Sequence, residues 1–207
     1  MPLIFQQQIN PHTKLGVWRI TEPEEFFKAK VPVHRQVSHP HKRLQHLAGR
    51  FLLQYLFPGF PHELIEIADT RKPFLPNEKY HFSISHCGNY AAAVVSSRNR
   101  VGIDAELISD KPEKLKHKFL TEDEISKLTT HDSRLTTNYQ LLTTLSWCCK
   151  EAVFKWYGNG EVDFKKHIQL KSITENFVET IFTKDISSSL KINFHFFDEI
   201  VLAWVVT

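Results

Sequence analysis

The most regular hydrophobic pattern of the chain lies between Ser38 and Phe57. Apolar residues recur there at every third or fourth position and form one continuous stripe, which predicts an amphipathic helix that ends at Pro58-Gly59. A second long helix is predicted from about Thr136 to Tyr157, because two glycines, Gly158 and Gly160, follow it and glycine is common just after a helix.

Shorter helices are predicted where a threonine precedes a glutamate by three positions, which is the spacing of a capping box. This pattern occurs at Thr21 with Glu24 and at Thr121 with Glu124. Between and after the helices, short runs rich in β-branched and aromatic residues predict strands. We expect strands at residues 15–20, 64–68, 81–85, 90–96, 101–106, 168–173, 177–183, 191–197 and 200–206.

The order of these elements predicts an α+β fold. Strands do not alternate regularly with helices, which favours small, mainly antiparallel sheets packed with helices. The chain has 207 residues, of which 42% are hydrophobic, and this length suits two small subdomains. We place the boundary near residue 100, so that residues 1–100 form an N-terminal subdomain and residues 101–207 a C-terminal one.

Charge and cysteine content narrow the classes of function. The formal net charge of +3 suits an anionic small ligand or an acidic protein partner, and it is too small to indicate nucleic-acid binding. Three cysteines make no disulfide framework and indicate a reducing compartment. No apolar run is long enough to span a membrane and the N-terminus lacks the features of a signal peptide, so we expect a cytoplasmic protein.

Two carboxylates alternate in the predicted strand 101–106. Asp104 and Glu106 are two positions apart, so both side chains point to one face of the strand. Like charges side by side repel each other, and a divalent cation that prefers oxygen ligands would relieve this repulsion. The alternative is an edge strand whose acidic face is solvated.

The second long helix carries a mixed stripe. Trp147, Glu151 and Lys155 are spaced by four and lie on one face, and Lys150 lies beside Glu151. An ordinary surface Glu–Lys pair would also explain these charges. Trp147 argues against a fully exposed face, because a large apolar ring is costly to leave in water.

Residues around the predicted strand 81–85 could bind anions. Ser85 and His86 end this strand before a glycine, but neighbours in a strand face opposite ways, so they do not suit a nucleophile–base pair. Ser85 could equally satisfy local backbone groups. Several basic residues could bind an anion together with Ser85 and His86, or they could simply form a solvated surface. They are Lys42, Arg43, Arg50, Arg71 and Lys72.

In this order the segments resemble the motifs of one family, the 4′-phosphopantetheinyl transferases of the two-domain type that activates peptide and polyketide synthetases. That family shows Lys-Pro before a strand ending in Ser-His, then Gly-(Ile/Val)-Asp-x-Glu, Phe-(Leu/Phe)-x-x-x-Glu and Trp-x-x-Lys-Glu-Ala-x-x-Lys. The resemblance covers about residues 40 to 157, and Cys148 stands where the family usually has serine. The corresponding segments here are Lys72-Pro73, Ser85-His86, Gly102 to Glu106, Phe119 to Glu124 and Trp147 to Lys155.

The resemblance implies two similar α+β subdomains related by a pseudo-twofold axis, with coenzyme A bound in a cleft between them. Asp104, Glu106 and Glu151 would bind a metal ion, for which we expect Mg²⁺, with Mn²⁺ as an alternative. Lys150 and Lys155 would contact the pyrophosphate of coenzyme A.

The resemblance also assigns the opposite end of coenzyme A. Ser85 and His86 would hold the 3′-phosphate, and Lys72 would assist them. An arginine of the first long helix would complete this site. Arg43 is the expected residue and Arg50 the alternative, because the N-terminal arginine motif aligns poorly.

The implied reaction transfers the 4′-phosphopantetheine group from coenzyme A to a serine of an apo acyl or peptidyl carrier protein and releases 3′,5′-ADP. Glu151 would act as general base, and Lys155 would stabilise charge on the leaving phosphate. The expected partner is a small acidic helical carrier domain. We expect the enzyme to be a monomer with no nucleic-acid or membrane partner.

Three alternatives stay open at this point. A metal-dependent phosphate-ester hydrolase could use the same carboxylates with water as nucleophile. A non-catalytic module that binds coenzyme A would need a degenerate site, although no motif carboxylate or lysine is missing. A zinc site is the third, but the spacing of its candidates matches no closed tetrahedral motif. These candidates are His34, His39, His41 and His46.

Overall fold

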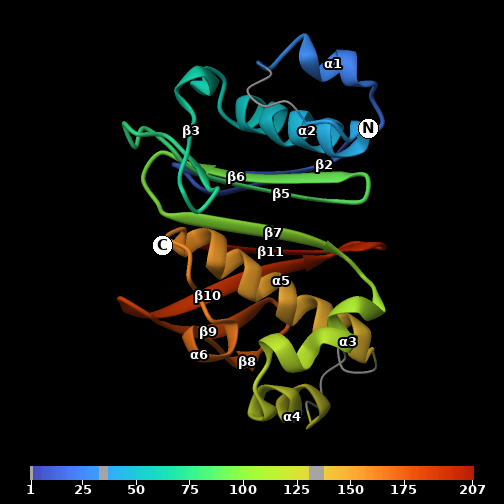
Figure 1. Ribbon diagram of the computed structural model, residues 1–207, viewed down its shortest axis with the longest axis vertical. Helices are drawn as coiled ribbons and strands as arrows, with labels where there is room; N and C mark the ends of the chain where they lie inside the picture. Colours follow the sequence, from blue (N-terminus) through green and yellow to red (C-terminus); the bar gives the residue numbers. More distant parts are fainter. Residues whose placement is uncertain (1, 33–36, 131–137) are drawn as a thin grey trace. The chain divides into compact units, whose positions relative to one another are not determined.

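The computed structural model describes residues 2–32, 37–130 and 138–207. Contacts along the chain divide it into two units, Met1–Ile103 and Asp104–Thr207. Each unit contains a sheet with antiparallel strand pairs and a long helix packed on that sheet (Figure 1). The predicted α+β class with antiparallel sheets is therefore confirmed.

Four strands form the sheet of the first unit, in the order β1-β2-β6-β5. Both β2 and β5 pair antiparallel with β6, so Ser85 lies opposite Ala92 and His86 opposite Ala91. Every residue of β6 is buried, as expected for an inner strand. The strands are β1 (Leu3–Asn10), β2 (Thr13–Arg19), β5 (His81–Cys87) and β6 (Tyr90–Ser96).

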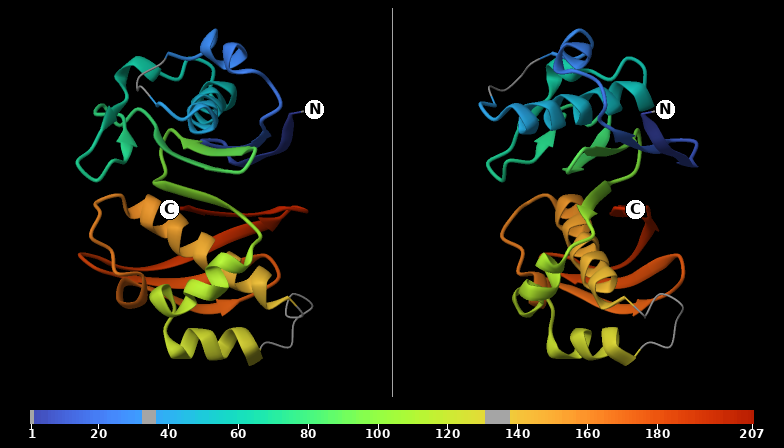
Figure 2. Two further views of the ribbon diagram at one scale, coloured as in Figure 1. Left: turned by 45° about the vertical axis from the view of Figure 1, so that its right-hand side comes forward. Right: turned by 90° about the vertical axis from the view of Figure 1, so that its right-hand side faces the viewer.

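Helix α2 (Pro40–Leu56) covers this sheet, as Figure 1 and both views of Figure 2 show. Proline suits the first helical position, and the side chain of His39 accepts a hydrogen bond from the backbone nitrogen of Lys42. The helix approaches β5 closely, since a Cβ atom at Gly49 would lie 2.6 Å from Cγ2 of Ile84. A larger residue at Gly49 would therefore push α2 away from the sheet.

Helix α1 (Glu24–Lys28) occurs next to the predicted capping box of Thr21 and Glu24, but the capping box itself is wrong. Pro23 precedes the helix and its side chain makes no capping hydrogen bond. The carboxylate of Glu24 instead pairs with Lys28 and with Arg43 of α2, whose Nε lies 2.8 Å from Oε1. Glu24 thus joins α1 to α2 instead of closing the first turn of its own helix.

The strand predicted at residues 64–68 is only partly right. A 3₁₀ turn, η1 (His62–Leu64), comes first, and the two-residue strand β3 (Glu66–Ile67) follows it. β3 pairs with β4 (Pro73–Phe74). Proline has no backbone N–H to donate, so Pro73 limits this ladder.

Five strands form the sheet of the second unit, in the order β7-β11-β10-β9-β8. All were predicted, but β10 begins at Ser187, four residues earlier than expected. The polar residues at its start pair with the end of β9, where Ser187 lies opposite Thr183. The strands are β7 (Val101–Leu107), β8 (Ile168–Ile173), β9 (Phe177–Thr183), β10 (Ser187–Phe196) and β11 (Ile200–Val206).

Helix α5 (Tyr139–Tyr157) lies across the second sheet (Figure 1). Asn138 caps it by accepting a hydrogen bond from the backbone nitrogen of Leu141 at 3.1 Å, and Gly158, with φ 79°, closes it as predicted. The expected start at Thr136 lies outside the described residues. Most of α5 is buried, so this helix forms the centre of the core of the second unit.

Three further helices belong to the second unit: α3 (Asp110–Phe119), α4 (Glu122–Thr130) and α6 (Phe164–His167). α3 was not predicted, because most of its residues are charged and give no clear apolar stripe. The capping box before α4 is confirmed. The backbone nitrogen of Thr121 donates to Oε2 of Glu124 at 2.8 Å, and that of Glu124 donates to Oγ1 of Thr121 at 3.2 Å.

Candidate functional site

Strand β7 carries two of the predicted site carboxylates. Asp104 is 3% exposed, and Glu106 is half-buried at the end of the strand. The indole nitrogen of Trp147 donates a hydrogen bond to Oε1 of Glu106 at 3.0 Å. Asp104 and Glu106 therefore belong to a partly buried site and not to a solvated acidic face, which was the alternative.

Helix α5 brings the predicted lysine to the same place. Nζ of Lys155 lies 2.6 Å from Oδ1 of Asp104. Burial lowers the pKa of Lys155, but the charge of Asp104 and its hydrogen bond, with a contribution from Glu151, raise that pKa overall. Lys155 is thus held as a cation beside the carboxylates.

The third predicted carboxylate, Glu151, is close enough to the other two to be affected by their charges. Burial and then the charge of Asp104 raise the pKa of Glu151 to about 7, and Glu106 adds to this effect. Burial and the charge of Asp104 also raise the pKa of Glu106. The three carboxylates of β7 and α5 thus lie within range of one another's charges, and a bound cation would relieve this repulsion.

The chemistry of these donors fits a divalent cation such as Mg²⁺, which prefers carboxylate oxygens. Within the described residues, no three His, Cys, Asp or Glu side chains are already arranged around one metal position. Lys155 engages one oxygen of Asp104, and Trp147 engages one oxygen of Glu106. A bound cation would therefore share Asp104 with Lys155 or displace that ammonium group.

The raised pKa of Glu151 predicts how stability depends on pH without a divalent cation. The folded chain keeps a proton on this side chain up to about pH 7, whereas the unfolded chain releases it near 4.5, so stability falls as pH rises through this window. Glu151→Gln should remove this loss and raise the free energy of unfolding at pH 8 by about 2 kcal/mol, discounted for partial exposure. Urea unfolding in EDTA from pH 4.5 to 8 measures how the free energy of unfolding of each protein depends on pH.

The matched control for this measurement is Glu175→Gln, in the exposed turn after β8. It should leave the pH dependence of the wild type unchanged. If the curves of Glu151→Gln and the wild type are parallel between pH 4.5 and 8, burial of a protonated Glu151 is refuted.

Trp147 is packed, as its apolar ring predicted. Its ring centroid lies 5.0 Å from that of Phe119 and 5.6 Å from that of Phe164. These three rings also line an open groove of the second unit, together with Leu115, Val162 and charged residues at its edge. The groove thus has an apolar wall. Trp147 belongs to this wall and directs its indole nitrogen to the Glu106 carboxylate.

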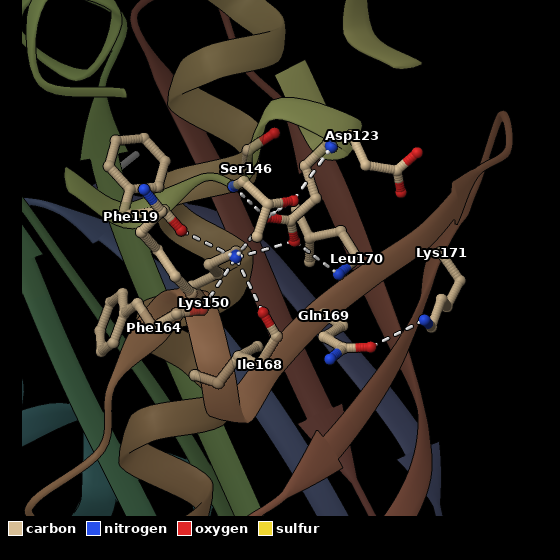
Figure 3. Close-up of polar contacts among 12 residues, drawn as sticks. Phe119, Asp123, Ser146, Lys150, Phe164, Ile168, Gln169, Leu170 and Lys171 are labelled. Atoms are coloured by element: carbon tan, nitrogen blue, oxygen red, sulfur yellow. Dashed lines mark hydrogen bonds and ion pairs between the residues drawn. The ribbon is translucent and has the colours of Figure 1, made fainter. Parts of the chain in front are cut away.

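Lys150 does not have the environment expected of a pyrophosphate ligand. Its side chain is 0% exposed, and Nζ lies 2.8 Å from Oε1 of Glu124. The same ammonium group donates to three backbone oxygens, as Figure 3 shows: those of Phe119 at 2.8 Å, Phe164 at 2.9 Å and Ile168 at 2.8 Å. All its donors are directed into the protein, which favours a structural role for Lys150 over the predicted contact with coenzyme A.

In the first unit, Ser85 and His86 point to opposite faces of β5. Ser85 is 6% exposed, whereas His86 is exposed and its ring lies 5.5 Å from that of His46. This alternation is the one expected for neighbours in a strand, and it leaves no basis for a Ser–His nucleophile–base pair. Of the two, only His86 is exposed.

Lys72 lies on the same unit in a basic environment. Burial, and then the charge of Arg100, lower the pKa of Lys72 to about 8. Two cations that repel each other would be stabilised by a bound anion. Sequence reasoning missed Arg100, since it belongs to none of the motifs.

The two candidate arginines differ in what they already bind. Nε of Arg43 is hydrogen-bonded to Glu24, and its NH1 donates to the backbone oxygen of Val37 at 2.8 Å. NH1 of Arg50 is buried and makes no hydrogen bond within the described residues, and burial lowers its pKa. The structure therefore favours Arg50, the alternative, over Arg43 as an anion ligand.

Arg43→Met should lower the free energy of unfolding slightly, because Glu24 and the Val37 carbonyl lose a donor. The affinity for coenzyme A should stay within about twofold of the wild type, as measured by titration calorimetry. Lys42→Met, on the neighbouring exposed residue, is the control for loss of charge. A tenfold loss of affinity at unchanged stability would contradict the structural role of Arg43.

The histidines of the first unit do not form a zinc site in the structure. Within the described residues no cluster of metal-ligating side chains is found. His39 caps α2, His41 contacts Oδ1 of Asn89 at 3.1 Å, and His46 faces His86. His34 lies outside the described residues.

No helix in the described part of the chain is long and apolar enough to cross a membrane.

Comparison with known proteins supplies the family. Enterobactin synthase component D of Escherichia coli (strain K12) is 35% identical over 130 residues, which are 60% of this chain and 60% of that protein. The same component of Salmonella typhi is 31% identical over 121 residues, 57% of this chain and 49% of that protein. The matched part thus spans at most 60% of the length of these relatives.

A family model described as the 4′-phosphopantetheinyl transferase superfamily matches residues 100–205, just over half of the chain. The match contains β7 and α5, the two elements that carry the carboxylates and Lys155. The chain therefore belongs to the 4′-phosphopantetheinyl transferase superfamily.

Proposed function

We propose that this protein transfers the 4′-phosphopantetheine group of coenzyme A to a serine of an apo acyl or peptidyl carrier protein and releases 3′,5′-ADP. The proposal is supported by the ion pair between Lys155 and Asp104 and by the effect of the Asp104 and Glu106 charges on Glu151 in the second unit. Three acids and one lysine form a site suited to a charged phosphoryl group and its counter-ion. Membership in the superfamily supports the same reaction class.

Asp104, Glu106 and Glu151 would hold a Mg²⁺ ion. When bound, such an ion neutralises charge on the pyrophosphate during transfer. Mn²⁺ could replace it, because both cations accept carboxylate oxygens. Trp147 orients Glu106 for this role by its hydrogen bond to Oε1.

Glu151 would act as the general base. The serine hydroxyl of the carrier gives its proton to this carboxylate as its oxygen forms a bond to the phosphorus that bears the pantetheine, and the bond from that phosphorus to the ADP oxygen breaks. Without a bound cation, burial and the charge of Asp104 raise the pKa of Glu151 to about 7, and a cation bound beside it would favour the ionised form that accepts a proton. Lys155 would stabilise the charge that develops on the leaving phosphate.

The 3′-phosphate of coenzyme A would bind residues of the first unit. His86 is exposed, Lys72 has Arg100 as a cationic neighbour, and Arg50 has an unused donor within the described residues. An added anion would reduce the repulsion between Lys72 and Arg100 and could accept a hydrogen bond from NH1 of Arg50. The pseudo-twofold relation of the two units and the ligand cleft between them stay predictions.

A carrier-protein mass assay tests the proposal. The wild type is incubated with coenzyme A, MgCl₂ and an apo carrier, and the carrier should gain the mass of one phosphopantetheine group. Carriers of fatty-acid, polyketide and peptide synthases should be compared, because the fold does not select among them. Phosphate-ester hydrolysis without a mass gain would refute the transferase and support a hydrolase, and a lack of both would leave a binding module.

A further inference from the structure

We propose that Lys150 and Glu124 are positioning residues, which hold the segments around Trp147 so that Glu106 and Glu151 are oriented for a divalent cation and for transfer. The proposal rests on the function proposed above for Glu106 and Glu151. It replaces the predicted contact of Lys150 with coenzyme A.

Lys150 joins four separate segments of the second unit. Figure 3 shows its ammonium group at the centre of contacts with the backbone oxygens of Phe119, at the end of α3, and Ile168, at the start of β8. It also donates to the backbone oxygen of Phe164 in α6 and pairs with Glu124 of α4. One side chain of α5 thus ties this helix to α3, α4, α6 and β8.

Glu124 completes the network with both carboxylate oxygens. Oε1 accepts from the backbone nitrogen of Leu170 at 2.8 Å, and Oε2 accepts from that of Thr121 at 2.8 Å. Glu124 is 5% exposed and Lys150 is 0% exposed. Removing either residue would leave a buried charge and several buried backbone groups without hydrogen bonds, so these two side chains determine how the segments pack.

The network reaches the candidate metal site through aromatic packing. Two of the backbone oxygens that Lys150 binds belong to Phe119 and Phe164, and the rings of these residues contact Trp147. Trp147 in turn donates its indole hydrogen to Glu106. A shift of either phenylalanine segment would therefore move the donor that orients a candidate ligand.

The helix provides a second and shorter connection. Lys150 precedes Glu151 in α5, and Lys155 follows Glu151 about one turn later. Fixing the direction of Lys150 fixes the rotation of α5 about its axis, and with it the direction of Glu151. A buried ion pair contributes little net stability compared with an apolar pair of the same volume, so its value lies in geometry.

The test compares Glu124→Gln and Lys150→Met with the wild type and with Lys127→Met, which removes the exposed ion pair between Lys127 and Asp123 on the same helix as Glu124. The affinity of each protein for Mn²⁺ is measured without coenzyme A by titration calorimetry. We expect both buried variants to bind Mn²⁺ at least about tenfold more weakly and Lys127→Met to bind it like the wild type.

Transfer kinetics separate positioning from substrate binding. Glu124→Gln should lower kcat at least about tenfold and leave KM for coenzyme A within about threefold, because the group lost does not touch coenzyme A. If Lys150→Met raises KM for coenzyme A strongly while Mn²⁺ affinity is unchanged, the proposal is overturned and the pyrophosphate contact is restored.

A double variant distinguishes geometry from stability and covers the case in which Lys150→Met does not fold. Lys150→Met with Glu124→Leu leaves no unpaired buried charge, so it should recover the part of the stability that a single variant loses to that charge, yet not the Mn²⁺ affinity. If the double variant recovers the stability and the Mn²⁺ affinity together, the proposal is overturned. Because Mn²⁺ affinity is read without transfer, a wild type that transfers nothing would refute the proposed function and leave this test valid.

Discussion

Glu151→Gln is expected to lower kcat for phosphopantetheine transfer by about 10³-fold, because the amide accepts no proton from the serine hydroxyl and is a poorer ligand for a divalent cation. The affinity for coenzyme A should change by less than about threefold, since the residues proposed for its 3′-phosphate lie on the first unit. The rate is measured as holo-carrier formed over time by mass spectrometry, and the affinity by calorimetry.

Glu175→Gln is the matched control, since it makes the same substitution in an exposed turn. It should transfer at the wild-type rate. If Glu151→Gln also transfers at that rate, Glu151 is neither the base nor an essential ligand, and the proposed mechanism is wrong at its central residue.

Lys155→Met is expected to lower the free energy of unfolding by about 3 kcal/mol in the absence of divalent cations, because it leaves the buried Asp104 carboxylate without its lysine. Transfer should fall as well, since the leaving phosphate loses the side-chain cation proposed to stabilise it. Urea unfolding in EDTA measures the first effect. Adding Mg²⁺ should stabilise this variant more than the wild type, because Lys155 no longer competes for Asp104.

Lys114→Met provides the comparison for this second prediction. It also breaks a lysine–aspartate pair, but the Lys114 and Asp110 side chains are 71% and 61% exposed. An exposed pair of this kind contributes little to stability, because water and salt screen it. A Lys155→Met variant that is as stable as Lys114→Met would show that the Asp104 pair is not buried in solution.

The sequence alone determined the main helices, most strands and the mixed stripe of Trp147, Glu151 and Lys155 on the second long helix. The apolar periodicity of α2 and the glycine after α5 are local signals, and both elements occur where they were predicted. The two-residue spacing of Asp104 and Glu106 and the four-residue spacing of Glu151 and Lys155 follow from backbone geometry. Such features depend on neighbours in the chain and can be recognised without the fold.

Only the tertiary structure decided which polar side chains turn inward and what they meet there. The Thr21 and Thr121 motifs look alike, yet only the second forms a capping box. Glu24 pairs with Arg43 of another helix, whereas Glu124 caps the first turn of its own helix and also pairs with Lys150. Lys150 lies beside Glu151 in sequence, but its acceptors come from α3, α4, α6 and β8. Periodicity tells which residues share a helix face, and distant segments that cover this face determine whether a lysine there binds ligand or backbone.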